Sequence, residues 1–502
     1  MKKKNEIRWI LLSAAIGLLA GCICLINTGK YGLGDSDYYW HSSLGKYIIE
    51  SGTIPKKDIF SWLSIEKGYL ETAHSWLGSV IIWLFSGAFL EPLCGAAAFI
   101  FVFVACISFL MSYLYGKPFD TLDRKFDFLN CFFSIFAGLS ITLTLNPARP
   151  GTIGLLCFLA GMYLLQDAYS EPDSKKWCFL PLVSIAWANL HGGAVPILIA
   201  FNVLFLVMAL VPRFSFVGII EETGRKRWRI KRMEALLAAD ISAALINPYG
   251  YKLFVYFFLT NTETTKKYVS EWQPIALKNL VVLTAIAILI GVFSIDSERK
   301  RIRFSYIMPV VATFAMTVKY CRIQSYLIIT AVMLAWQCAK DASGEWRPKR
   351  FNSLSAWRVS ILLLICCVPM LLAGKVSMTE MINGSENDPD RLSEELIECL
   401  KKTSPERMYC DYNTGGFLIF HGFKSFIDSR ADPFPDDVLE KAVMFSDING
   451  MSSSELCDYI SEYRFDALLL DKNANLNAWL EENEAWRIQY ADDDYCLYSL
   501  AS

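Results

Sequence analysis

The chain has few charged residues and almost no histidine for its length. Of its 502 residues, 20% are charged, below the roughly 25% of ordinary soluble domains, and four are histidine. It contains no Cys-x-x-Cys pair, no internal repeat and no low-complexity stretch. Its basic residues occur in short runs between apolar segments. These absences argue against a cysteine-based metal motif, a repeat architecture and a nucleic-acid-binding protein.

Long apolar segments are what the chain has instead. Apolar residues make up 54% of it, and many windows of 16 to 24 residues carry almost no charge. We therefore predict a mainly α fold, a polytopic bundle of about 11 to 13 transmembrane helices. The segment near 75–90 is short, and re-entrant or interfacial placement is an alternative for it. The expected spans lie at about residues 7–26, 75–90, 92–115, 126–145, 151–169, 176–191, 193–211, 234–246, 278–294, 305–319, 322–338 and 358–374.

Charge is distributed unevenly along the chain. Residues 375–502 contain 26 acidic and 11 basic residues, whereas the preceding part has a basic excess. Basic loops at 213–232, 299–303 and 347–350 indicate the cytoplasmic side. We therefore expect a cytoplasmic N-terminus with an uncleaved first helix, because no small-residue cleavage motif follows it. The external loop 27–74 and the acidic tail then lie outside.

Two domains are predicted. Residues 1–375 form the transmembrane domain with its external loop, and 376–502 form a soluble extracytoplasmic α/β domain. In this tail we expect a helix at 391–402, strands at 408–412, 425–428, 467–471 and 494–500, and helices at 436–446, 453–463 and 475–484. The four tail cysteines could form one or two disulfides outside the cell, but their spacing indicates no pairing.

An acidic pair follows the first apolar helix directly. Asp35 and Asp37 precede an expected helix over about 37–50 that Gly52 ends. The pair could hold a divalent cation, Mg²⁺ or Mn²⁺, against a lipid-linked phosphate. Alternatively, one carboxylate is the general base for an acceptor hydroxyl, or the pair only caps the helix. His41 comes four residues after Asp37 and would share its helical face.

Further candidates for binding a substrate or its phosphate lie at external turns. Arg149 stands between two apolar segments, where a guanidinium suits a lipid phosphate but can also reach the headgroups by snorkelling. Asn189 and His191 occupy a tight glycine turn, and Arg322 stands at an external turn beside Lys319. His74 precedes an apolar segment and could meet His41 across the loop. For each, a purely structural role is the competing interpretation.

Two candidates remain, one in the tail and one in an apolar segment. Asp428, Arg430 and Asp432 form a polar cluster that could belong to a site at strand ends, or could be an ion pair that stabilises the domain. Asp240 lies inside an apolar segment, where an ionisable group is costly unless it is paired.

These motifs, in this order, resemble a large family of bacterial polytopic membrane proteins, over about residues 8–435. The sequence departs from the family pattern at Tyr38-Tyr39 and at Ser75. The matching positions are Asp35, Asp37, Trp40, His41, Gly45, Gly52, Pro55, Asp58, Phe60, Ser61, His74, Trp76, Leu77, Arg149, Pro150, Trp187, Asn189, His191, Asn247–Gly250, Glu271, Trp272, Pro274, Gly415–Phe420 and Phe426–Asp432.

That family is in turn similar to the GT-C superfamily of membrane glycosyltransferases, which use polyprenyl-phosphate sugars and an acidic residue in the first external loop. The resemblance implies a transferase that moves a sugar from a polyprenyl-phosphate carrier to an envelope glycan, lipid or protein at the outer face of a bacterial plasma membrane. Asp35 and Asp37 would be catalytic, and Asp58 would join the substrate-binding residues.

Other interpretations stay open. A transporter or flippase of envelope lipids would place ionisable groups at mid-membrane and show inverted repeats, and we see no repeat. A non-catalytic assembly protein with an external domain is a third interpretation. Apart from the divalent cation, no cofactor is expected. The expected partners are a lipid-linked sugar donor, an envelope acceptor and the bilayer, without nucleic acid.

Overall fold

The computed structural model divides the chain into two compact units. We call residues 1–30, 97–257 and 269–378 the helical unit, and residues 31–96, 258–268 and 379–502 the loop–tail unit. The predicted domains placed the external loop 27–74 with the transmembrane part, whereas this division groups residues 31–96 with the tail. The structure describes residues 2–31, 35–88, 90, 92–116, 124–139, 148–210, 219–220, 227–259, 267, 272–276, 302–342, 392–430, 432–448 and 451–501.

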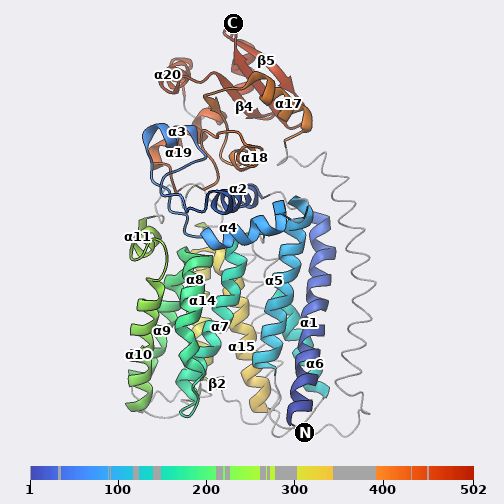
Figure 1. Cartoon of the computed structure of the whole chain (residues 1–502), viewed down its shortest axis with the longest axis vertical. Helices are drawn as coiled ribbons and strands as arrows, with labels where there is room; N and C mark the ends of the chain where they lie inside the picture. Colours follow the sequence, from blue (N-terminus) through green and yellow to red (C-terminus); the bar gives the residue numbers. More distant parts are fainter. Residues whose placement is uncertain are drawn as a thin grey trace. The chain divides into compact units, whose positions relative to one another are not determined.

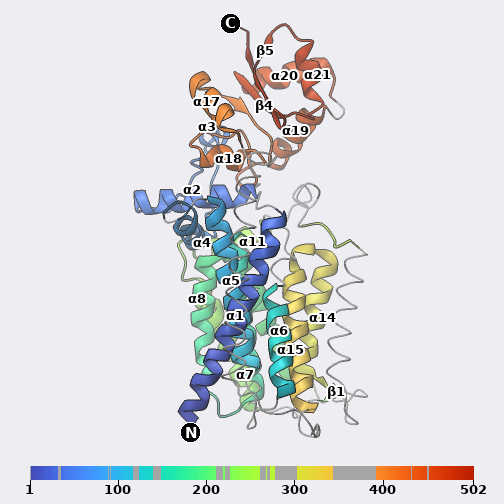
Figure 2. The same ribbon diagram turned by 90° about the vertical axis from the view of Figure 1, so that its right-hand side faces the viewer.

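The long helices of the helical unit run lengthwise side by side (Figures 1 and 2). Among the described residues, four segments are long and apolar enough to cross a membrane: Glu6–Ile26, Pro92–Tyr115, Pro150–Ser170 and Gly192–Leu210. They correspond to α1 (Lys2–Tyr31), α5 (Pro92–Tyr115), α7 (Pro150–Ser170) and the turn η4 (Gly192–Ala194) with α9 (Val195–Leu210). The predicted polytopic helical bundle is confirmed.

The other helices of this bundle are shorter. They are α6 (Arg124–Leu139), α8 (Leu180–Leu190), α10 (Arg227–Ala244), α11 (Lys252–Leu259), α14 (Phe304–Lys319) and α15 (Gln324–Ala342). Two 3₁₀ turns, η3 (Lys176–Phe179) and η6 (Cys321–Ile323), join them, and β1 (Ile219–Ile220) pairs in parallel with β2 (Ile302–Arg303). The spans expected at 278–294 and 358–374 lie outside the described residues.

Asp240, on α10, links three of these helices by accepting hydrogen bonds from uncharged side chains of α8 and α9. Its two carboxylate oxygens accept from Ser184 Oγ of α8 at 3.1 Å and from Asn202 Nδ2 of α9 at 2.7 Å. All three side chains are fully buried. Asp240 therefore has a structural role in packing α8, α9 and α10, with amide and hydroxyl donors as its partners.

The loop part of the loop–tail unit contains α2 (Ser36–Ser51), α3 (Trp62–Lys67), α4 (Trp76–Trp83) and a π-helix, η1 (Leu84–Ala88). Gly52 ends α2 with a φ of 65°, as the sequence predicts. Because α4 has 8 residues and η1 has 5, together they extend only about 20 Å. That is less than the roughly 30 Å hydrocarbon core, so the segment near 75–90 is too short for a straight span.

The tail has a four-stranded sheet in the order β3-β4-β6-β5, with β3 parallel to β4 and the other pairs antiparallel. The strands are β3 (Met408–Tyr409), β4 (Ala467–Asp471), β5 (Trp486–Ala491) and β6 (Tyr495–Leu500). The helices are α17 (Glu394–Thr403), α18 (Gly415–Phe420), α19 (Asp436–Asp447), α20 (Ser453–Tyr463) and α21 (Leu476–Glu481). The predicted C-terminal α/β domain is confirmed.

Three details of the predicted tail are wrong. The expected strand at 425–428 is only an isolated bridge between Ser425 and Ser61, after which the chain turns. The expected strand at 408–412 ends after Tyr409, because Asp411 starts a turn by accepting from the backbone N–H groups of Asn413 and Thr414. The edge strand β5 was not predicted, since four of its six side chains are exposed and it lacks the continuous buried apolar run of β4.

Residues of the loop complete the hydrophobic core of the tail. The Trp62 indole N–H donates to the Met408 carbonyl at 3.0 Å. The Trp62 ring packs against Phe426 and Phe465, with centroids 5.4 and 6.1 Å apart, and the Arg407 guanidinium lies over it at 4.5 Å. Because Trp62 is buried among tail aromatics, loop and tail share one core.

The tail cysteines form no disulfide in the structure. Cys399, Cys410, Cys457 and Cys496 are all free. Cys410 is buried, and its thiol donates to the Ile427 carbonyl at 3.3 Å while accepting from the Phe426 N–H at 3.4 Å. This thiol therefore contributes to packing.

Candidate functional site

The acidic pair begins α2, and its two members have different roles. Asp35 has an extended backbone, and its Oδ1 accepts from the Asp37 N–H at 3.2 Å, so the capping role is confirmed for Asp35. Asp37 lies in the first turn, where its Oδ1 accepts from the Trp40 indole N–H at 3.0 Å. The two residues are only 7% and 8% exposed. The Trp40 hydrogen bond therefore holds Asp37 in a fixed orientation.

The His41 side chain of α2 contacts α4. Its ring stacks on Trp40, with centroids 3.6 Å apart, and its Nδ1 lies 2.8 Å from Ser79 Oγ. Four residues later, Gly45 brings the backbones of α2 and α4 into contact, because a Cβ there would overlap the Ser79 carbonyl oxygen. His74, just before α4, has its Nδ1 3.3 Å from the Thr72 carbonyl oxygen. His41 thus joins α2 to α4, whereas the contact of His74 is local to the segment before α4.

A metal ion would need ligands beyond this pair. Within the described ranges, no three His, Cys, Asp or Glu side chains are grouped so as to hold a metal. Mg²⁺ is commonly held by one or two carboxylates together with substrate phosphates. Asp35 and Asp37 would fit that arrangement only with a phosphate bound, so the cation stays a prediction.

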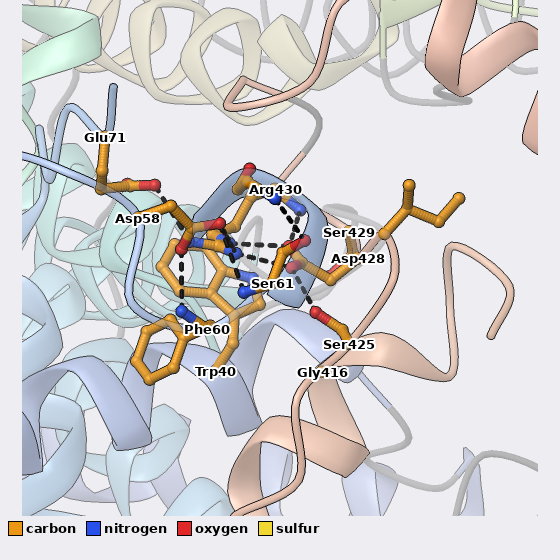
Figure 3. Close-up of polar contacts among 12 residues, drawn as sticks. Trp40, Asp58, Phe60, Ser61, Glu71, Gly416, Ser425, Asp428, Ser429 and Arg430 are labelled. Carbon is orange, nitrogen blue, oxygen red and sulfur yellow. Dashed lines mark hydrogen bonds and ion pairs between the residues drawn. The ribbon is translucent and has the colours of Figure 1, made fainter. Parts of the chain in front are cut away.

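A cluster of buried ion pairs surrounds Arg430 in the loop–tail unit (Figure 3). Its Nε and Nη2 donate to Asp428 at 2.7 and 2.6 Å, and its Nη1 and Nη2 donate to Asp58 at 2.7 and 3.1 Å. Nη1 also donates to Glu71 Oε2 at 2.9 Å. All four side chains are buried. We call these residues the Arg430 cluster; they use all five N–H donors of the guanidinium.

The Arg430 cluster has three carboxylates for one guanidinium, and this excess changes the protonation of Glu71. Burial raises the pKa of Glu71 to about 8, and the negative charges of Asp58, Asp432 and Asp428 add to this, although Arg430 opposes it. Burial also disfavours ionised Asp58, but the charge and hydrogen bonds of Arg430 outweigh it and lower the pKa of that carboxyl. Glu71 is therefore the member that retains a proton near neutral pH.

The Arg430 cluster revises the predicted tail site. Asp428 and Arg430 pair as expected, and the exposed Asp432 adds its negative charge at Glu71. Asp58, which the family resemblance places among the substrate-binding residues, engages Arg430 with both carboxylate oxygens. Sequence reasoning missed Glu71. Its only signal was an acidic residue three positions before His74 at the edge of an apolar segment.

The remaining predicted residues belong to the helical unit. Arg149 has the extended backbone of the residue before α7, which Pro150 begins. Asn189 Nδ2 donates to the Ile185 and Ile246 carbonyls at 2.8 and 2.9 Å and so ties α8 to the end of α10. Arg322 stacks over the Trp272 ring at 4.5 Å. Asn189 thus has a structural bond network, whereas both arginines stand at turns.

His191 follows α8 and packs against α7. A Cβ at Gly154 of α7 would lie 3.1 Å from His191 Nδ1 and 2.9 Å from Trp187 Nε1. The glycine therefore leaves room for both rings, and the Trp-Ala-Asn-Leu-His segment fits against this small-residue surface. The position of His191 is fixed by the contact between α7 and α8.

No family model and no curated protein sequence matches the chain. Several solved structures of glycosyltransferases do match the chain in fold. One is a crystal structure of the Archaeoglobus fulgidus oligosaccharyltransferase with a tethered acceptor peptide. The match spans 94% of this chain and 69% of that protein's chain, at 12% identity and a TM-score of 0.52. Another is the arabinofuranosyltransferase AftD from Mycobacteria. That match spans 99% of this chain and 42% of the AftD chain, at 12% identity and a TM-score of 0.54.

A further structure is the archaeal oligosaccharyltransferase AglB from Archaeoglobus fulgidus with an inhibitory peptide and a dolichol-phosphate. The match spans 92% of this chain and 69% of the AglB chain, at 11% identity and a TM-score of 0.51. At these identities the likeness is one of fold. The expected GT-C-like fold of a multi-pass membrane protein is confirmed.

Proposed function

We propose that the protein is an integral-membrane glycosyltransferase of the GT-C type. It would transfer a sugar from a polyprenyl-phosphate carrier to an envelope glycan, lipid or protein acceptor. The observation that carries the proposal is a buried, oriented carboxylate, Asp37, in the first loop of a chain with this fold. The dolichol-phosphate bound to one structure of the same fold supports a lipid-phosphate donor.

In this proposal Asp37 is the catalytic base and Asp35 mainly holds the turn. A carboxylate oxygen of Asp35 is engaged in the cap, whereas Asp37 is held by a side-chain donor. Asp37 would accept the proton of the acceptor hydroxyl as that oxygen attacks the anomeric carbon. The bond between the anomeric carbon and the carrier phosphate breaks as the new bond forms, which inverts the configuration at that carbon. A divalent cation held by the pair is the alternative role.

Cationic and polar residues of the helical unit would receive the lipid phosphate. Arg149 and Arg322 are the leading candidates, because a guanidinium can bind two phosphate oxygens. His191 would assist, whereas both amide N–H groups of Asn189 already donate to carbonyls. In the loop, His41 and His74 are the further candidates for binding the substrate. We further propose that the protein resides in a bacterial plasma membrane with a cytoplasmic N-terminus. The loop–tail unit would then face outside, in contact with the bilayer and the acceptor.

The test is sugar transfer by the purified full-length protein in liposomes, using a panel of labelled polyprenyl-phosphate sugars. Asp37→Asn should lower kcat by about 10²-fold or more, because an amide cannot accept the proton. Asp35→Asn should retain most activity, since Asn caps a helix about as well as Asp. Asp436→Asn is the matched control, because Asp436 is an exposed first-turn aspartate of α19.

Three outcomes are informative. Wild-type activity in Asp37→Asn would refute the catalytic role. Equal and complete loss in both amide variants, together with inhibition of the wild type by a chelator, would favour the cation role of the pair. A wild-type protein that transfers no sugar but moves lipid-linked sugars across the bilayer would support the transporter interpretation.

A further inference from the structure

A helix of the tail packs directly on the acidic turn. The Gly416 N–H of α18 donates to Ser36 Oγ at 3.2 Å, and Ser36 stands between Asp35 and Asp37. A Cβ at Gly416 would overlap both the carbonyl oxygen and the hydroxyl of Ser36. The Tyr39 ring of α2 also packs against α18, with its centroid 4.6 Å from that of Phe417 and 5.1 Å from that of Phe420. Only glycine permits this approach of α18 to α2.

A neighbouring face of α18, about 100° around the helix from Gly416, rests on the Arg430 cluster. A Cβ at Gly415 would overlap the Ile427 carbonyl oxygen and the Asp428 side chain. Asp428 is in turn bound by Arg430 and by Ser425 Oγ at 3.0 Å. A continuous stack of buried groups therefore runs from the Arg430 cluster through two glycines to Ser36.

Arg430 also forms ion pairs with the segment that joins α2 to α4. Asp58 lies after the end of α2 and Glu71 lies before α4, so the guanidinium binds this connection near both of its ends. α4 then contacts α2 through Ser79 and His41. The helix that bears Asp37 is thus held at its first turn by α18 and, through the connection, by Arg430.

We propose that Gly416 and Arg430 are positioning residues for the transfer reaction, through which the tail fixes the acidic turn in its reactive geometry. The inference rests on the proposed function. Arg430 cannot act on the substrate directly, because all of its donors are occupied by Asp58, Glu71 and Asp428. A misplacement of about 1 Å at a reacting group can cost 10²-fold in rate, so a small shift of the turn would be sufficient.

Gly416→Ala tests the proposal in the full-length protein. The added methyl should displace the acidic turn and lower kcat by about 10- to 100-fold, while the KM for the lipid-linked donor changes by about twofold or less. Hydrogen exchange of the amides at 37–41 should become at least about 10-fold faster. Asn413→Ala is the control, because Asn413 is exposed in the turn before α18.

Arg430→Lys is the second variant, since lysine keeps the charge but loses the planar five-donor fork. Like Gly416→Ala, it should lower kcat while leaving the KM for the lipid-linked donor nearly unchanged. Should either variant fail to accumulate in folded form, Ser36→Ala replaces it. That change removes only the hydroxyl bonded to the Gly416 N–H, and it should lower kcat by about three- to tenfold.

Unchanged kcat and unchanged exchange of the first turn of α2 in these variants would overturn the positioning role. Loss of affinity with an unchanged kcat would also overturn it, because that result would show that the tail binds substrate. A wild-type protein that uses no sugar donor would refute the proposed function instead. The exchange measurement would then still decide whether α18 holds the acidic turn.

Discussion

Replacing Glu71 by glutamine should make the stability of the loop–tail unit less dependent on pH. Folded Glu71 retains its proton up to about pH 8, whereas in the unfolded chain it ionises near its ordinary pKa of 4.5. The folded state therefore binds more protons between these values, so the free energy of unfolding falls as the pH rises through this window. One proton corresponds to about 1.4 kcal/mol per pH unit, which gives a loss of about 4 kcal/mol between pH 5 and pH 8.

Glutamine cannot ionise, yet it can still accept the hydrogen bond from Arg430. Glu71→Gln should therefore match the wild type near pH 5 and be about 3 to 4 kcal/mol more stable at pH 8. The assay is denaturant unfolding of the purified protein in detergent, followed by tryptophan fluorescence from pH 5 to pH 9. Glu398→Gln is the control, because Glu398 is exposed on α17. Parallel curves for the wild type and Glu71→Gln would refute the raised pKa.

Three other predictions follow from the packing and the proposed topology. Trp62→Ala should destabilise the tail by about 3–5 kcal/mol in denaturant unfolding, whereas Lys67→Ala, an exposed change on the same helix, should have little effect. Gly154→Ala should separate α7 from α8 and lower the melting temperature by several degrees in detergent, because Trp187 Nε1 and His191 Nδ1 leave no room for a methyl group. A cysteine placed at Lys57 in a cysteine-free background should react with an impermeant maleimide on intact cells, and labelling only after lysis would invert the proposed topology.

The bundle and the start of the acidic helix could be predicted because their signals are local. Apolar windows indicate spans wherever they occur, and Asp35 followed by a helical pattern that ends at Gly52 defines α2 within a single stretch of sequence. Strand β4 is a short buried apolar run, and it was predicted with its observed bounds.

The Arg430 cluster could not be predicted in this way. Arg430 and its partner Asp58 are 372 positions apart, and Glu71 is 359 positions away. No periodicity or spacing within a segment indicates such pairing. The same reason explains the error at 425–428, where the segment Ser-Phe-Ile-Asp, predicted as a strand, instead bridges to Ser61 and brings Asp428 and Arg430 toward the loop.

The most direct test of the account is an experimental structure of the full-length protein with a polyprenyl phosphate bound. Our account predicts the carrier phosphate beside the acidic turn, with the Asp37 carboxylate facing the position that the sugar would occupy. It also predicts that Gly416 N still donates to Ser36 Oγ in that complex. A phosphate bound far from Asp37, with the acidic turn closed to substrate, would contradict the central claim that this carboxylate performs the chemistry.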